Sequence, residues 1–256
     1  AVVFVISELV CVACVPERPV ACDEKPGKIS DMFKALFKND QAMTVVVSII
    51  LVYTSLNICG NLVLYFFRFD VGNEGAYSIF AAVAFAAQVL VMMVIPLLKS
   101  QLFISGFIIQ IAGFAVILIM AFAKLYTPQS WYILCLPGIL IYLGYGMLNV
   151  IMTIFLSDSV DYGEVMNGTR EESVIFSMQT FTVKLASGVA VFLAGLVVDW
   201  IHLDTAAAVQ TQDTLDALRM WMTIPSVILL IVGIFVFKRF YKLDDTRMEE
   251  IKSKLN

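Results

Sequence analysis

Long runs of apolar residues separated by short polar connections dominate the chain. Six of them have about the length that a helix rising 1.5 Å per residue needs to cross a hydrocarbon core of about 30 Å. The runs cover Ala42–Phe67, Ala76–Leu98, Leu102–Ala123, Trp131–Leu156, Val174–Val198 and Met220–Phe237. The pattern therefore predicts an all-α membrane protein with six spanning helices.

A shorter apolar run, residues 1–15, opens the chain. It has no preceding methionine, charged region or small-residue cleavage site of the kind found in a signal peptide. We interpret it as the end of a spanning helix that is cut by the start of the chain, so that the chain is a fragment. A short re-entrant segment is the alternative at this length.

Residues 16–41 form a linker that is interrupted by proline and glycine. Within it, Ser30 can cap a short helix with one apolar face, made of Ile29, Met32, Phe33, Leu36 and Phe37. Such a helix is expected to lie along the inner membrane surface. It can act as a hinge between two helical bundles or as a simple tether. We assign residues 42–238 to a six-helix bundle and residues 239–256 to a cytoplasmic tail.

Composition supports a membrane setting. The chain is 60% hydrophobic and 15% charged, whereas a soluble domain is about 45–50% apolar and about 25% charged. The net charge of −4 offers no basic surface for nucleic acid. Lysine and arginine gather in alternate connections and in the tail, which places the C-terminus in the cytoplasm of a multi-pass inner-membrane protein. The opposite connections carry only Arg68, Lys124 and Arg219.

Polar residues inside the runs form three stripes at spacings of three and four, so each stripe shares one helix face. The stripes are Thr54, Asn57, Asn61 and Tyr65; Tyr142, Tyr145, Asn149 and Thr153; and Ser173, Ser177, Thr180, Lys184 and Ser187. Three polar stripes suggest a shared wet cavity. The alternative is that these side chains only join helices through interhelical hydrogen bonds, which we favour for the serines and leave open for Asn57, Asn61 and Asn149.

Lys184 is the one cation in the middle of an apolar run. A lysine at the centre of a bilayer costs about 2.5–3.5 kcal/mol, so it is expected to face a cavity or a counter-charge. No acid lies at a comparable depth in the six predicted spans. We therefore favour a role in substrate binding or coupling over a static ion pair, whose partner would have to lie outside this chain.

Two acids, Asp158 and Asp161, are expected at or just past the end of the Trp131–Leu156 helix. The helix dipole disfavours anions there by about 0.3–1 kcal/mol each, so cations should meet them. Arg170 is the local candidate, and a second cation could come from elsewhere. Such pairs can form a cytoplasmic gate that opens when they break, although a solvated loop is the simpler reading.

The same segment carries the string D-x-x-D-Y-G-E-x-x-x-G-x-R-x-E, from Asp158 to Glu172, followed by F-S-M-Q-T-F-T-V-K, which ends at Lys184. This pattern resembles the signature of the glycoside-pentoside-hexuronide cation symporters of the major facilitator superfamily. The resemblance implies that the chain holds the last six of twelve helices and the end of the sixth. It also implies that Thr180, Val183 and Lys184 line a sugar site and that Asp158, Asp161 and Arg170 form cytoplasmic salt bridges.

The sequence departs from the family at two points. Asn167 and Thr169 flank Gly168 where the family often has basic residues, so fewer cations are available to hold the gate. Asn149 stands where we expect the best-known member to carry an aromatic residue near the sugar. The family's cation site and its acidic sugar-binding residues lie in the first six helices, which this chain lacks.

We therefore expect sugar or glycoside symport by alternating access, driven by sodium or protons and shared with an N-terminal half. Sugar is expected to contact Lys184, Thr180, Val183, Asn149, Asn57 and Asn61. An uncoupled facilitator or a transporter of lipid or another solute is the alternative. An enzyme is not expected, because the sequence holds one histidine and no H-E-x-x-H or G-x-S-x-G motif. No cofactor or metal is expected, since Cys11, Cys14 and Cys22 have no fourth ligand nearby.

Overall fold

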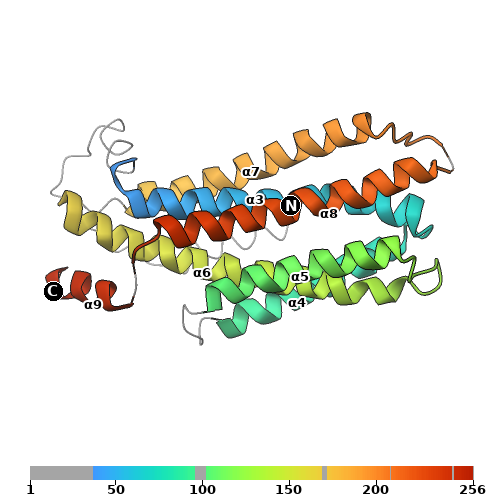
Figure 1. The fold of residues 1–256 in the computed structure, drawn as a ribbon. Coiled ribbons are helices and arrows are strands. Elements are labelled where there is room, and N and C mark those ends of the chain that lie inside the picture. Colours follow the sequence, from blue (N-terminus) through green and yellow to red (C-terminus); the bar gives the residue numbers. More distant parts are fainter. Residues whose placement is uncertain (1–36, 96–101, 169–171, 208, 244, 256) are drawn as a thin grey trace, which may run out of the picture.

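In the computed structural model, described for residues 37–95, 102–168, 172–207, 209–243 and 245–255, the chain is a bundle of long helices. Figure 1 shows that these helices run roughly along one axis, alternately up and down. They are α3 (Asp40–Tyr65), α4 (Ala76–Val94), α5 (Phe103–Phe122), α6 (Cys135–Asn167), α7 (Glu172–Trp200) and α8 (Gln212–Phe240). Each is long enough and apolar enough to cross a membrane. The prediction of an all-α fold with six spanning helices is therefore confirmed.

Three short elements complete the described chain. A π-helical turn, η1 (Phe66–Asp70), extends α3, and a 3₁₀ turn, η4 (Trp131–Leu134), leads into α6. The last helix, α9 (Asp245–Leu255), lies beside the end of α6 (Figure 1). We call this end of the bundle the α9 end and the opposite end the far end. Of the apolar face of the predicted linker helix, only Phe37 lies within the described residues, and the predicted helix in residues 1–15 lies outside them.

The helix ends follow local chemistry. At the start of α3, the Asn39 side chain accepts a hydrogen bond from the backbone of Ala42 at 2.9 Å, which satisfies a free amide of the first turn. At the end of α6, Gly168 adopts a left-handed φ of 73°, and its amide donates to Glu164 at 2.8 Å. Glycine takes that conformation without a Cβ clash.

Two of the predicted boundaries are wrong. We expected the fourth span to end at Leu156 and a loop to follow, but α6 continues to Asn167. We expected the last span to begin at Met220, but α8 begins at Gln212, where Thr211 caps it. In both places a polar stretch extends the helix beyond the apolar run, because a helix needs an apolar face only where it meets hydrocarbon or the core.

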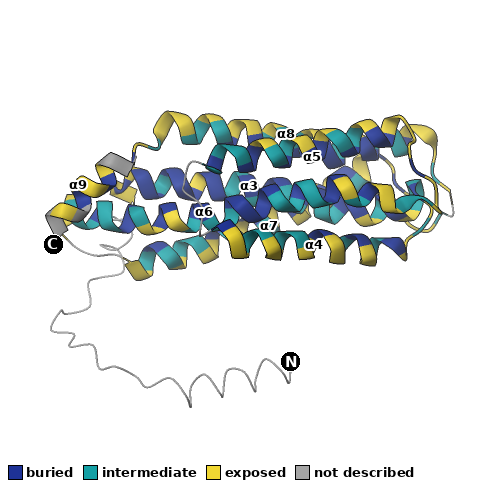
Figure 2. Ribbon diagram, turned by 90° about the horizontal axis from the view of Figure 1, so that it is seen from below, coloured by how far each residue is buried: buried dark blue, intermediate teal, exposed yellow. Residues whose placement is uncertain are grey.

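Burial is uneven across the bundle. Most of the apolar segments of α3 and α6 are buried, whereas α4 is almost entirely exposed on its outer side. Figure 2 shows the buried positions facing inward between the helices and the exposed ones on the outer faces. The exposed side chains are largely apolar, among them Phe85, Leu90, Met93, Ile119, Phe192 and Phe235. An apolar outer face around a packed interior is the arrangement expected in lipid.

Close backbone approach holds α5 against α6. A Cβ on Gly144 would lie 2.6 Å from the Gln110 nitrogen and 2.6 Å from the Gly106 oxygen. Small residues that let helix backbones touch are a common means of packing in membranes, where burial of apolar surface adds little. Besides α5, α6 also packs against α3 and α4.

Candidate functional site

A group of polar side chains joins α3, α6 and α7 in the middle of the bundle. The Asn149 amide donates to the Tyr53 hydroxyl, the Thr153 hydroxyl donates to the Asn149 carbonyl at 3.0 Å, and the Gln179 amide donates to the Thr153 hydroxyl at 3.1 Å. The Tyr145 ring meets the Tyr53 ring edge-on, with centroids 5.3 Å apart. We call Tyr53, Tyr145, Asn149, Thr153 and Gln179 the central polar cluster.

Asn57 and Asn61 continue this polar surface along α3. Both are half-buried, and each donates its amide to the carbonyl four residues earlier, at 2.7 Å. Their side-chain oxygens make no hydrogen bond within the described chain. An asparagine oxygen can accept two hydrogen bonds, so both residues keep acceptors available for a ligand.

Lys184 and Thr180 lie on an exposed face of α7, one turn apart. The Thr180 hydroxyl donates to the Phe176 carbonyl at 3.3 Å. Among the described residues, no hydrogen bond or ion pair reaches the Lys184 ammonium. Lys184 stands 12 residues after Glu172 and 16 before Trp200, close to the middle of α7. Val183 beside it is half-buried and packs against the core.

Two members of the central polar cluster, Tyr53 and Gln179, were missed by the sequence analysis. We had predicted Thr54 on the polar face of α3, but Tyr53 is the residue that joins the cluster. Thr54 is buried, and its hydroxyl has no hydrogen-bond partner among the described residues. The spacing of four in Tyr53, Asn57 and Asn61 was the signal that could have found it. Gln179 lies next to Thr180 in sequence, but only the packing of α7 against α6 turns it toward Thr153.

We had expected Asp158 and Asp161 at or just past the end of α6. Both lie inside this helix instead, near the α9 end of the bundle. The dipole effect is confined to the last turn, so our electrostatic reason for a cation partner there was wrong. Arg170 lies outside the described residues. Both acids do make polar or electrostatic contacts.

One neighbour of Asp158 is Tyr241, just after α8. Tyr241 is half-buried, and its hydroxyl has no hydrogen-bond partner in the described chain. Burial raises the pKa of Tyr241 above its usual range, and the negative charge of Asp158 raises it further. Leu243, Met248 and Ile251 pack against Tyr241 and against the α6 side chains Tyr162 and Val165. The chain after α8 therefore covers the acidic end of α6.

The same end of the bundle is tied together through α3. The Asn39 amide donates to the Ser159 carbonyl of α6 at 2.7 Å. The Gln41 oxygen accepts from the backbone of Lys242 at 2.8 Å. These two contacts connect the start of α3 to the ends of α6 and α8.

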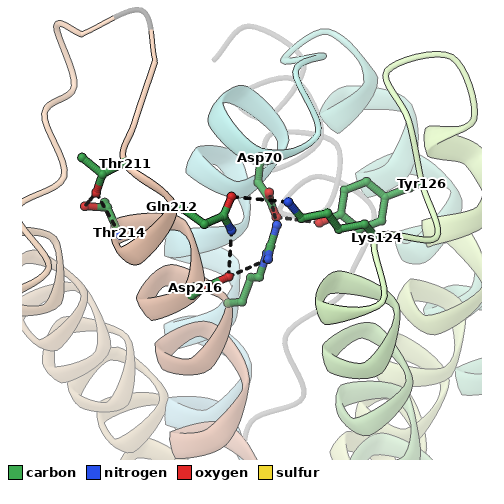
Figure 3. Close-up of polar contacts among 8 residues, drawn as sticks. Asp70, Lys124, Tyr126, Thr211, Gln212, Thr214 and Asp216 are labelled. Atoms are coloured by element: carbon green, nitrogen blue, oxygen red, sulfur yellow. Dashed lines mark hydrogen bonds and ion pairs between the residues drawn. The ribbon is translucent and has the colours of Figure 1, made fainter.

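A buried charge cluster closes the far end. Figure 3 shows Asp70, Tyr126 and Asp216 pointing toward one another from three different segments. Arg219 donates to Asp70 through Nε at 2.8 Å and through Nη2 at 2.5 Å, and to Asp216 through Nη1 at 2.7 Å. The Tyr126 hydroxyl donates to Asp70 at 2.5 Å. Only 2% of the Arg219 side chain and 3% of the Asp70 side chain are exposed.

The environment of this cluster changes the chemistry of Tyr126. Burial raises the pKa of the Tyr126 phenol above its usual range, and the hydrogen bond to Asp70 raises it further. Nearby, the Lys124 ammonium donates to Gln212, which donates to Asp216 at 3.0 Å (Figure 3). The sequence analysis had placed Lys124 and Arg219 in connections and had not paired either of them.

Within the part of the chain that the structure describes, no group of three or more histidine, cysteine or acidic residues could hold a metal ion. The two cysteines in this part, Cys59 and Cys135, are unpaired. The polar groups in the middle of the bundle are thus amides, hydroxyls and one ammonium, which bind neutral polar ligands through hydrogen bonds.

Comparison with known proteins finds sequence relatives among transporters. The chain is 24% identical over 254 residues to an uncharacterized symporter, YjmB, of Bacillus subtilis (strain 168), covering 96% of this chain and 54% of the relative. It is 22% identical to the raffinose carrier protein of Pediococcus pentosaceus, covering 89% of this chain and 35% of the carrier. It is 24% identical to the isoprimeverose transporter of Lactiplantibacillus pentosus, covering 86% and 46%.

The chain thus spans about half, or less, of the length of these curated relatives. The family described as MFS/sugar transport protein matches residues 1–245, which is nearly the whole chain. The six-helix bundle of this chain is consistent with one half of a major facilitator fold. The resemblance to glycoside-cation symporters that was seen in the sequence is confirmed. The chain belongs to the MFS/sugar transport protein family of the major facilitator superfamily.

Proposed function

We propose that this chain is the C-terminal half of a transporter that moves a sugar or glycoside together with sodium or a proton. The substrate binds in the middle of the membrane, between this bundle and an N-terminal half. Rocking of the two halves then exposes the site to one side and to the other in turn. The transporter acts without a cofactor and without catalysis.

The observation that carries this proposal is the position of Lys184. It is a cation with no partner among the described residues, on an exposed face in the middle of an apolar helix. The cost of placing it in hydrocarbon, about 2.5–3.5 kcal/mol, is avoided if this face of α7 borders a polar cavity. Family membership supports such a cavity, since transporters of this kind hold substrate between two helical bundles.

The polar residues predicted for the substrate site fit a sugar. Asn57, Asn61 and Asn149 offer amide groups, and Thr180 offers a hydroxyl. Sugar hydroxyls both donate and accept hydrogen bonds, and these side chains can do the same. We assign Lys184, Thr180, Val183, Asn149, Asn57 and Asn61 to the substrate site, and we add Tyr53 and Gln179 from the central polar cluster.

The direction of the chain in the membrane follows from its charges. Lysine and arginine are concentrated at the α9 end, including Lys238, Arg239 and Lys242, so this end lies in the cytoplasm of the inner membrane. Asp158, Asp161 and Arg170 then form the cytoplasmic gate. Tyr241 and α9 cover the acidic end of α6, which supports a closed gate on that side.

Relatives named for raffinose, isoprimeverose and lactose support a carbohydrate substrate, and relatives named symporters support cation coupling. We expect the coupling cation to bind in the N-terminal half. An uncoupled facilitator, or a transporter of lipid or another solute, is the second candidate.

The test is counterflow of radiolabelled sugars in vesicles that carry the full-length transporter, with and without a sodium or proton gradient. The proposal expects exchange of at least one sugar, and accumulation that collapses when the gradient is removed. Exchange that ignores both gradients would favour the uncoupled facilitator. Absence of exchange for every sugar tested would mean that the substrate is of another class.

A further inference from the structure

A second polar surface lies outward of the proposed sugar site, between the far-end halves of α3 and α7. There the two helices border a pocket of about 360 Å³. This size is near the lower end of the range for small-molecule sites, roughly 300–1,000 Å³. Asn61 and Tyr65 line it from α3, and Val191, Gly195, Val198 and Asp199 line it from α7.

The pocket continues the face of α7 that carries Lys184. Lys184, Gly188, Val191, Gly195 and Asp199 follow one another at spacings of three and four, which keeps them on one side of a helix. On α3, Asn57, Asn61 and Tyr65 follow at spacings of four. At 1.5 Å per residue, Tyr65 lies about 12 Å beyond Asn57 along the helix, toward the far end.

The polar groups of the pocket are available for a ligand. Within the described chain, the Asp199 carboxylate and the Tyr65 hydroxyl make no hydrogen bond, and Asn61 uses only its amide, toward Asn57. Gly195 borders open space, because a Cβ there would meet nothing within 4 Å. A carboxylate, an amide oxygen and a phenol bind hydroxyl groups well, whereas one carboxylate is too few for calcium, which takes about 6–8 oxygen ligands.

We infer that this pocket is a second carbohydrate subsite, which contacts an outer ring of a substrate whose inner end lies at Asn57 in the proposed sugar site. The Asp199 carboxylate and the Asn61 oxygen accept hydrogen bonds from sugar hydroxyls, and the Tyr65 ring packs against the apolar face of the sugar. Since about 12 Å of helix separates Tyr65 from Asn57, a single sugar ring cannot contact both. The substrate class is therefore an oligosaccharide or an extended glycoside. This inference rests on the proposed function.

The test compares short and long sugars on the full-length transporter in detergent. Binding is measured by calorimetry for galactose, melibiose and raffinose, and for glucose, maltose and maltotriose, two series in which each sugar extends the one before. The variants are Asp199→Asn, Tyr65→Leu and Gly195→Leu, the last of which fills the pocket. Asp213→Asn is the matched control, since Asp213 is an exposed acid at the same end on α8, outside the pocket.

We expect each pocket variant to weaken binding of the longest sugar that binds the parent by tenfold or more and to change binding of the monosaccharide by less than twofold. Asp213→Asn should change neither. Equal losses for short and long sugars would overturn the subsite and favour a pocket that receives a helix of the N-terminal half. Unchanged binding, or a parent that binds only monosaccharides, would overturn it too. A parent that binds no sugar would refute the proposed function itself. A pocket variant that does not fold is replaced by Val191→Leu, a change at an exposed position of the same pocket.

Discussion

Arg219 and Asp70 lie 149 residues apart in the sequence, yet two nitrogens of the guanidinium contact both oxygens of the carboxylate, at 2.8 and 2.5 Å. The pair joins the start of α8 to the π-helical turn after α3 at the far end of the bundle. Asp216 and Tyr126 complete the contacts of the two charges. A buried ion pair is tolerated only when its remaining donors and acceptors are satisfied in this way.

Replacing one partner should therefore be costly. Arg219→Gln leaves the Asp70 carboxylate buried without its charge partner, a change that costs about 3–5 kcal/mol in comparable pairs. We expect a large fall in the melting temperature of the full-length protein in detergent. Arg68→Gln is the control, because the pair of Arg68 with Glu74 is exposed and 3.7 Å long, and such pairs contribute about 0–1 kcal/mol. Similar melting temperatures for the two variants would show that the Asp70 pair is not structural.

Alkaline pH should act on the same cluster. The raised pKa of Tyr126 means that the folded protein holds this proton more tightly than the unfolded chain. The protonated Tyr126 hydroxyl contributes its full stabilisation below the pKa of an unfolded tyrosine, about 10. This stabilisation is lost as the pH rises above that value. The melting temperature of the parent should fall more steeply above pH 10 than that of Tyr126→Phe, which cannot titrate. Parallel curves would contradict a protonated Tyr126.

Lys184 should affect sugar affinity and not stability. Lys184→Gln keeps a hydrogen-bond donor but removes the charge, so we expect at least a tenfold loss of sugar affinity, about 1.4 kcal/mol. Lys184→Arg should not restore binding, because the planar guanidinium cannot occupy the same point as an ammonium. The measurement is calorimetry on the full-length protein, with Lys124→Gln as the control at the far end. If Lys184→Gln binds sugar as well as the parent, Lys184 is instead the partner of a charge outside this chain.

Asp158 should control access from the cytoplasm. Asp158→Asn and Arg170→Ala each remove a charge from the proposed gate, so both should shift the full-length protein toward inward-facing states. Cysteines introduced along the cytoplasmic half of the cavity should then react faster with a membrane-impermeant thiol reagent. Glu249→Gln, which changes an exposed acid of α9, should have no such effect. Unchanged reactivity in both gate variants would remove the gating role.

Gly144 should be sensitive to the smallest increase in size. Gly144→Ala places a methyl group 2.6 Å from backbone atoms of Gln110 and Gly106, which cannot move aside as a side chain can. Overpacking of this kind costs about 1–3 kcal/mol, and a lower melting temperature should report it. Gly60→Ala is the control, since its Cβ meets nothing within 4 Å and alanine favours the helix. Equal stability of the two variants would mean that α5 and α6 can separate.

The sequence alone determined the number of spanning helices and their approximate centres. A helix needs about 20 apolar residues to cross the hydrocarbon core. Each apolar run can be judged by this criterion without information about the other runs. The family pattern between Asp158 and Lys184 was equally local. Helix ends were less predictable, because α6 and α8 extend into polar stretches. The polar side chains of these stretches find their partners on other segments of the folded chain.

Only the tertiary structure decided which polar residues meet. Asn57, Asn149 and Lys184 stood out in the sequence because each is polar in an apolar run, but Tyr53 and Gln179 entered the central polar cluster through the packing of α3 and α7 around α6. Arg219 stood out in the sequence only as a cation of a connection, and its pairing with Asp70 became visible only in the folded bundle. Hydropathy predicts which segments lie in the membrane. The partners of a residue depend on how helices that are far apart in the sequence rotate and pack against one another.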